Sequence, residues 1–226
     1  LPSYIRHLPV KSSDIAATGL PQPLWRSAIE HPSFDDYWKR ISVRERIQRV
    51  NIPTLSFGGW FDNYAESDLD AFSRLALRHK PVETWIGPWA HNPAFRFVTR
   101  DFGPRARPGI RPLEADWFDK WLKKNPVPII ETAIHPAPLL HIFVMGPDIW
   151  REEHEWPLAR TRYTPLYLES EGRANSSGGD GTLRWQPVSR SKTDTFTYDP
   201  RDPVPTTGGA ICCEPRILPP GPLDQT

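Results

Sequence analysis

Residues 51–92 begin NIPTLSFGGWFDNYAESDLDAF and end ETWIGPWAHN, and they contain two similar units in series. Each unit is a short apolar run typical of a buried strand, at residues 54–57 and 82–86, followed by a turn that contains glycine. The first turn presents Asp62 and the second presents His91. Because functional groups in open α/β sheets gather at the carboxyl ends of the strands, we expect this acid and this histidine to lie close together.

An acid followed by a histidine is the order in which α/β-hydrolases place the last two members of their catalytic triad. In such a triad the acid orients the imidazole, and the imidazole takes a proton from the nucleophile and later returns it. The alternative interpretation is structural, with Asp62 capping a helix and His91 serving as a hydrogen-bonded loop histidine. Spacing alone does not decide between these two readings.

The turns GGWFDNY, at residues 58–64, and IGPWAHN, at residues 86–92, resemble motifs of a known family. It is the cocaine-esterase and X-prolyl dipeptidyl-peptidase group of serine hydrolases (the CocE/NonD family). In that family the Asp of the first motif and the His of the second are the triad acid and base, and they match Asp62 and His91. The resemblance implies an α/β plus all-β fold: the C-terminal portion of an α/β-hydrolase domain, with part of a helical cap, followed by a partial jelly-roll β-sandwich.

Two aromatic residues beside Asp62 are the predicted substrate-binding residues, Tyr64 and Trp60, because the turn that presents the acid also carries them. Glu66 and Asp68 follow at the start of the next helix, where carboxylates suit the helix dipole. The alternative for one of these two carboxylates is to bind a substrate amine.

The rest of the chain is divided by composition and periodicity. Apolar spacing predicts helices at residues 24–30, 34–41, 66–78 and 112–124. Four prolines in NPVPIIETAIHPAP predict a linker, and the strand-like runs LLHIFVMG, TPLYLES, GTLRW and DTFTYDP beyond it favour an all-β sandwich. We therefore assign residues 1–50 to the end of the cap, 51–125 to the hydrolase domain, 126–138 to the linker and 139–226 to the partial jelly roll.

Composition narrows the classes of partner. The 226 residues carry 28 basic and 27 acidic side chains, and the net charge of +1 gives no electrostatic reason to expect nucleic acid or an anionic membrane. No apolar run approaches the ~20 residues of a membrane-spanning helix. The family resemblance, in turn, implies a small ester, amide or short peptide substrate, no cofactor or metal, and a β domain that can self-associate. No signal-peptide pattern is visible, so a cytoplasmic location is expected, although Leu1 is not a start methionine and the chain reads as a piece of a longer protein.

The two cysteines, Cys212 and Cys213, are adjacent, and neighbouring cysteines rarely bond to each other. We therefore expect small buried side chains or free thiols there, without assigning them a role.

No Gly-x-Ser-x-Gly nucleophile elbow occurs in the sequence. In the resembled family this elbow precedes the cap, so the resemblance implies a fragment of a serine hydrolase whose nucleophile lies upstream of these residues, and the fragment alone should be inactive. A non-catalytic binding or assembly module with a β-sandwich is the main alternative, motivated by the absent serine and by 10 tryptophans. Metal-dependent hydrolysis is a weaker alternative, because the seven histidines are scattered and form no His-Glu-x-x-His pair.

Overall fold

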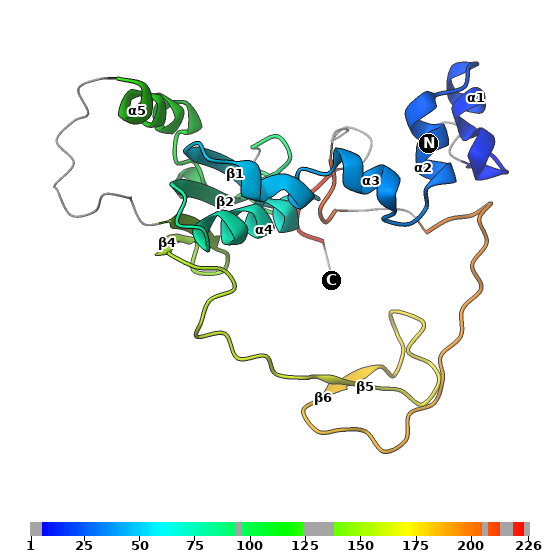
Figure 1. Ribbon diagram of the computed structural model, residues 1–226. Helices are drawn as coiled ribbons and strands as arrows, with labels where there is room; N and C mark the ends of the chain where they lie inside the picture. The colour runs from blue at the N-terminus through cyan, green and yellow to red at the C-terminus, as the bar shows by residue number, and fades with distance from the viewer. Residues whose placement is uncertain (1–5, 94–95, 124–137, 205–207, 213–218, 224–226) are drawn as a thin grey trace. The chain divides into compact units, whose positions relative to one another are not determined.

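The computed structural model describes residues 6–93, 96–123, 138–204, 208–212 and 219–223. The chain divides into two compact units, one made of Leu1–Arg26 with Arg160–Pro205 and the other of Ser27–Ala159 with Thr206–Thr226. The helices and strands, labelled as in Figure 1, are η2 (Val10–Ser12), α1 (Ser13–Thr18), α2 (Pro23–Glu30), α3 (Asp36–Ile41), η3 (Arg44–Arg49), β1 (Thr54–Phe61), α4 (Ala65–Ala76), β2 (Val82–Ala90), η4 (Pro104–Ala106), α5 (Ile110–Leu122), β3 (Leu139–Val144), β4 (Ile149–Glu153), β5 (Tyr167–Glu169) and β6 (Thr182–Arg184).

A four-stranded sheet forms the centre of the larger unit, with the strand order β1-β2-β3-β4. β1 and β2 are parallel, and α4 connects them, as parallel neighbours require a crossover. β3 runs parallel to β2, and β4 returns antiparallel to β3. The predicted strand, helix and strand of residues 51–92 are therefore confirmed, and both strands extend beyond their predicted ends into the glycine-containing turns.

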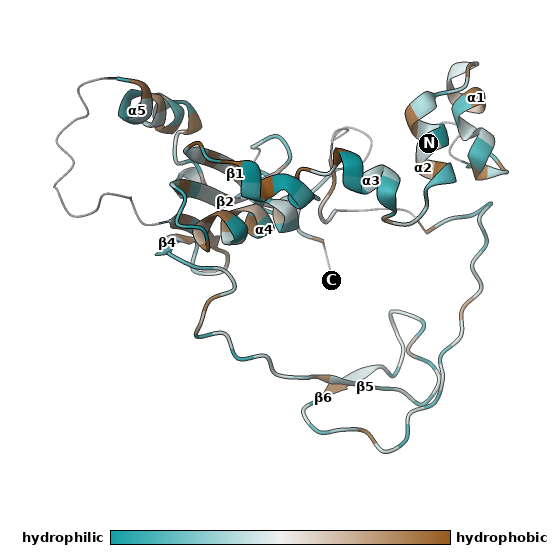
Figure 2. Cartoon of the chain, in the orientation of Figure 1, coloured by the Kyte–Doolittle hydropathy of each residue, from teal (hydrophilic) through white to brown (hydrophobic). Residues whose placement is uncertain are grey.

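Helix α4 covers one face of this sheet, and Figure 1 shows it alongside β1 and β2. Its Leu69, Phe72 and Leu75 are buried, as their spacing predicts, and they pack in one cluster with Ile86 and Leu140 of the strands. Figure 2 shows hydrophilic residues on the same helix, so α4 is amphipathic. Burying each large apolar side chain stabilises the fold by about 1.5–3 kcal/mol, which makes this cluster the main support of the sheet.

A second apolar cluster holds the loop that follows β2. Phe102, Ala106 and Phe143 are buried together, with Phe61 and Trp150 packed against them. The indole N–H of Trp89, near the end of β2, donates to the carbonyl oxygen of Ala106 at 2.7 Å. This contact ties the returning loop to the strand that leads into His91.

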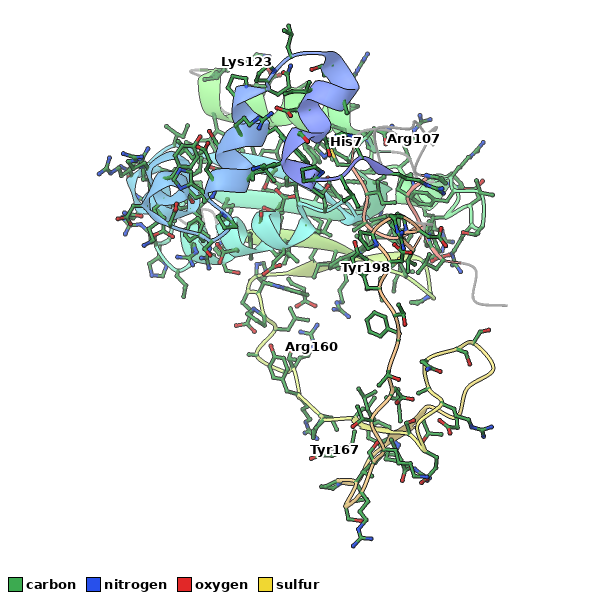
Figure 3. All side chains as sticks on the ribbon, turned by 90° about the vertical axis from the view of Figure 1, so that its right-hand side faces the viewer. His7, Arg107, Lys123, Arg160, Tyr167 and Tyr198 are labelled. Carbon is green, nitrogen blue, oxygen red and sulfur yellow. The ribbon has the colours of Figure 1, made fainter. Side chains whose placement is uncertain are left out.

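The β-rich half is arranged differently from the predicted sandwich. The run LLHIFVMG does form a strand, β3, but it pairs with β2 in the central sheet, because Leu140 and Ile142 complete the core under α4. TPLYLES and GTLRW supply β5 and β6, which form a separate antiparallel pair. Figure 3 shows the side chains around Tyr167, on β5, projecting from this pair. DTFTYDP, at residues 194–200, forms no strand, and its Phe196 is 84% exposed.

Three further expectations concern the cysteines, the linker and membrane-spanning helices. Cys212 is disulfide-bonded, so the expectation of a free thiol is wrong at that residue, and Cys213 lies outside the described residues. The predicted linker falls almost entirely outside the described residues as well. Within the described ranges no helix has the length and hydrophobicity needed to cross a bilayer.

Candidate functional site

The carboxyl ends of β1 and β2 approach each other unusually closely. Gly59 pairs with Gly87, and a Cβ atom on Gly59 would overlap the carbonyl oxygen of Trp89. The register then shifts between Gly59 and Phe61, which marks a bulge at the end of β1. Glycine at residue 59 thus lets the turn after β1 lie against the turn after β2.

Asp62 occupies the turn after β1 and is buried, with 7% of its surface exposed. Its backbone N–H donates to the carbonyl oxygen of Gly59 at 2.9 Å, which closes the turn. Its carboxylate oxygen Oδ1 accepts a 3.0 Å hydrogen bond from the N–H of Tyr64, just before α4 begins at Ala65. The N-terminus of α4 therefore lies beside the Asp62 carboxylate.

His91 follows β2 directly and faces the second oxygen of the same carboxylate. Its Nδ1 lies 3.0 Å from Oδ2 of Asp62. Because an ionised carboxylate only accepts hydrogen bonds, Nδ1 must carry the proton, and in the neutral imidazole Nε2 then bears the free lone pair. The His91 side chain is 49% exposed, and the structure records no hydrogen bond from Nε2 to any described residue. The arrangement is therefore an oriented imidazole whose outer nitrogen is free to take a proton.

The two predicted substrate-binding residues lie in different environments. The ring of Tyr64 is 5.3 Å from the His91 ring, and Tyr64 is 48% exposed, so it lines the surface beside the histidine. Trp60 instead donates from its indole N–H to the carbonyl oxygen of Phe143 at 2.8 Å and packs against the apolar core beside Trp156. Of the two residues, the structure brings only Tyr64 next to His91.

Asp68, on α4, also belongs to this neighbourhood, although its sequence position favoured a helix-dipole role over binding of a substrate amine. Burial raises the pKa of its carboxyl to about 6, the negative charge of Asp62 adds to the increase, and His91 acts in the opposite direction. The available signal was periodicity, because Asp68, Phe72 and Leu75 follow the i, i+4, i+7 spacing of one helix face. An acid on the apolar face of α4 is therefore expected to point toward the sheet.

A cavity of about 650 Å³ lies between η3 and α4, and Asp68 is among its lining residues. Arg44 and Arg74 also line it, and both bind the carboxylate of Asp70, at 2.9 and 2.7 Å. Within the described part of the chain, no group of three or more His, Cys, Asp or Glu side chains is placed to hold a metal ion.

Comparison with known proteins places this site in a wider context. Residues 5–93, which include Asp62 and His91, match the family profile of X-Pro dipeptidyl-peptidase (S15 family). The cocaine esterase of Rhodococcus sp. (strain MB1 Bresler) is 36% identical over 188 residues, which is 81% of this chain and 32% of the esterase. The chain thus spans about a third of the length of this curated relative.

Proposed function

Since this chain belongs to the group that contains the S15 X-Pro dipeptidyl-peptidases and cocaine esterase, we propose that it is part of a serine hydrolase that cleaves ester or amide bonds. The observation that carries the proposal is the 3.0 Å contact between Nδ1 of His91 and Oδ2 of Asp62. It joins the ends of two parallel strands and leaves Nε2 free, as the base of a catalytic triad requires.

In the proposed reaction the nucleophile is a serine supplied by a part of the protein that precedes these residues, since no nucleophile elbow occurs among them. Nε2 of His91 takes the proton from the serine hydroxyl as the serine oxygen attacks the substrate carbonyl. The same nitrogen returns the proton to the departing alcohol or amine, and a water molecule then repeats the sequence to release the acid. Asp62 holds the imidazole in the required tautomer and stabilises its cation.

The fold supports this assignment in two ways. The parallel strands β1, β2 and β3 with α4 fit the later portion of an α/β-hydrolase sheet, where the acid and the histidine follow successive strands. The pair β5 and β6 fits the beginning of a β-sandwich that further strands would complete.

Tyr64 is the residue we assign to the wall of the acyl pocket, because it is exposed beside His91. X-Pro peptides, amino-acid esters, aryl esters and acylated β-lactams are the candidate substrates.

The test replaces His91 by alanine in the intact protein and measures hydrolysis of p-nitrophenyl acetate and of an X-Pro p-nitroanilide. Loss of the base should lower kcat by about 10³-fold or more. The matched control is His31→Ala, because Nδ1 of His31 also contacts a carboxylate, Oδ2 of Asp35, at 2.6 Å. Full turnover by the His91 variant, or an equal loss in the His31 variant, would contradict the proposal.

A further inference from the structure

The carboxyl group of Asp68 lies against the backbone of β1 at a position where the strand has no side chain. A Cβ atom on Gly58 would overlap Oδ2 of Asp68 and would come within 2.9 Å of Cδ1 of Ile86. Gly58 pairs with Ile86 of β2 and precedes Asp62 by four residues. The missing side chain therefore admits a second, half-buried carboxyl beside β1 next to Gly59, whose carbonyl oxygen accepts the N–H of Asp62 at 2.9 Å.

Charged residues near Asp68 come from α4, η3 and the two turns that follow β1 and β2. On α4 itself Glu66 is exposed, and Asp70 is bound by Arg74 and by Arg44 of η3. The two strands contribute Gly58 and Ile86, which carry no charge. Asp62 and His91, from the two turns, are the charges whose influence on Asp68 is recorded. Asp68 is thus coupled to the Asp62–His91 pair.

Water can reach Asp68, because the residue lines the cavity between η3 and α4. A half-buried carboxyl with solvent access can exchange its proton with water, and a raised pKa lets it do so in the pH range in which a histidine titrates. With a pKa of about 6, Asp68 is ionised at neutral pH and becomes protonated in mildly acidic solution.

We propose that Asp68 is a positioning residue for the Asp62–His91 pair, a second carboxylate that stabilises the imidazolium formed when His91 accepts a proton. The catalytic consequence of this inference rests on the proposed hydrolase function. The electrostatic coupling between Asp68 and the pair is independent of that function. Two nearby anions favour the protonated imidazole more than one does. Below the titration of Asp68 the second anion is lost, and the support for the imidazolium falls.

The experiment follows the His91 ring by NMR between about pH 4 and 9, in the intact protein and in its Asp68→Asn variant. Removal of the charge should move the midpoint of His91 protonation to lower pH by about half a unit or more. Glu66→Gln is the matched control, because it removes an exposed carboxylate from the same helix and should leave the midpoint in place. An unchanged midpoint in Asp68→Asn, or an equal shift in Glu66→Gln, would overturn the proposal.

A reciprocal variant, His91→Asn, tests the same coupling if the Asp68→Asn protein does not fold. Because coupling between two titrating groups is mutual, His91→Asn should raise the pH at which the Asp68 carboxyl titrates, and an unmoved Asp68 titration would count against the coupling. The acid limb of kcat/KM should move to lower pH in Asp68→Asn, together with the NMR midpoint.

The role of Asp68 and the hydrolase assignment can fail separately. If the midpoint shifts while His91→Ala retains full turnover, the coupling stands and the hydrolase assignment fails. If His91→Ala is inactive and the midpoint does not shift, the assignment stands and the role of Asp68 fails.

Discussion

The four-stranded sheet and the pair β5–β6 contain similar apolar residues in very different surroundings. Leu140 on β3 is fully buried, whereas Leu168 on β5 is 78% exposed and its cross-strand partner Leu183 is 60% exposed. The difference is the covering layer, because α4 packs on the central sheet, while β5 and β6 form a two-stranded sheet with no third strand among the described residues. A strand-forming sequence thus gives a rigid element only where another element buries one of its faces.

The candidate site lies on the covered sheet, and this location has a physical reason. A hydrogen bond between two turns is reproducible only when the strands that carry the turns cannot slide. The core beneath β1 and β2 supplies that restraint through Phe72 and Ile86, which are both less than 2% exposed. The contrast with β5–β6 is open to direct tests.

The largest effect is expected from Phe72→Ala, which leaves a cavity in the core between α4 and the sheet. Such truncations cost about 3–5 kcal/mol of unfolding free energy, since the surroundings relax only partly. Urea unfolding followed by tryptophan fluorescence measures it. Phe196→Ala is the control, because Phe196 is 84% exposed and its loss should change stability by less than about 0.5 kcal/mol. Equal costs for the two variants would remove the distinction between the regions.

A smaller but more local effect is expected from Gly59→Ala. The new Cβ would overlap the carbonyl oxygen of Trp89, and backbone cannot yield as a flexible side chain can. We expect a cost of about 1–3 kcal/mol, together with loss of the His91–Asp62 hydrogen bond, seen as a changed His91 ring resonance. Gly178→Ala is the comparison, because no atom lies within 4 Å of a Cβ placed there. A Gly59 variant as stable as the Gly178 variant would mean that the strand ends are not held together as described.

The smallest effect is expected from Leu168→Ala on the exposed pair. A side chain that is 78% exposed loses little burial on truncation, so the thermal midpoint should change by less than about 2 °C. Differential scanning fluorimetry is sufficient for this measurement. A loss comparable to that of Phe72→Ala would show that β5–β6 is covered in the intact protein, and the comparison would then apply to only part of it.

Local patterns predicted the centre of the molecule well. The periodicity of residues 51–92 is strong enough to predict β1, α4 and β2, and the parallel geometry that follows explains why Asp62 and His91 meet. Contacts between distant residues were not predictable in this way. The hydrogen bond from Trp60 to Phe143 spans 83 residues, and no local signal in SFGGWFD, at residues 56–62, distinguishes an indole that packs inward from one that lines a pocket.

Two other differences share this cause. LLHIFVMG has the same strand signal whether it joins a sandwich or the central sheet, and only the burial of Leu140 and Ile142 against the α4 core decides between them. Asp68 was grouped with Glu66 by its place in the first turn of α4, although its periodicity places it on the buried face. In both cases the tertiary contact decides, with the α4 core for the strand and with the sheet for Asp68.

Strand β1 has a consequence for handling the protein. It lies at the end of the strand order, so within the described residues one of its edges pairs with β2 and the other pairs with no strand. The carbonyl oxygen of its last residue, Phe61, accepts a 3.3 Å hydrogen bond from the N–H of Ile211. Its eight residues, TLSFGGWF, include no charged side chain and no proline, the features that natural edge strands use to discourage pairing with other chains. The 226-residue chain, prepared by itself, is therefore expected to self-associate through the exposed edge of β1. This association would limit its solubility under conditions in which its core is still folded.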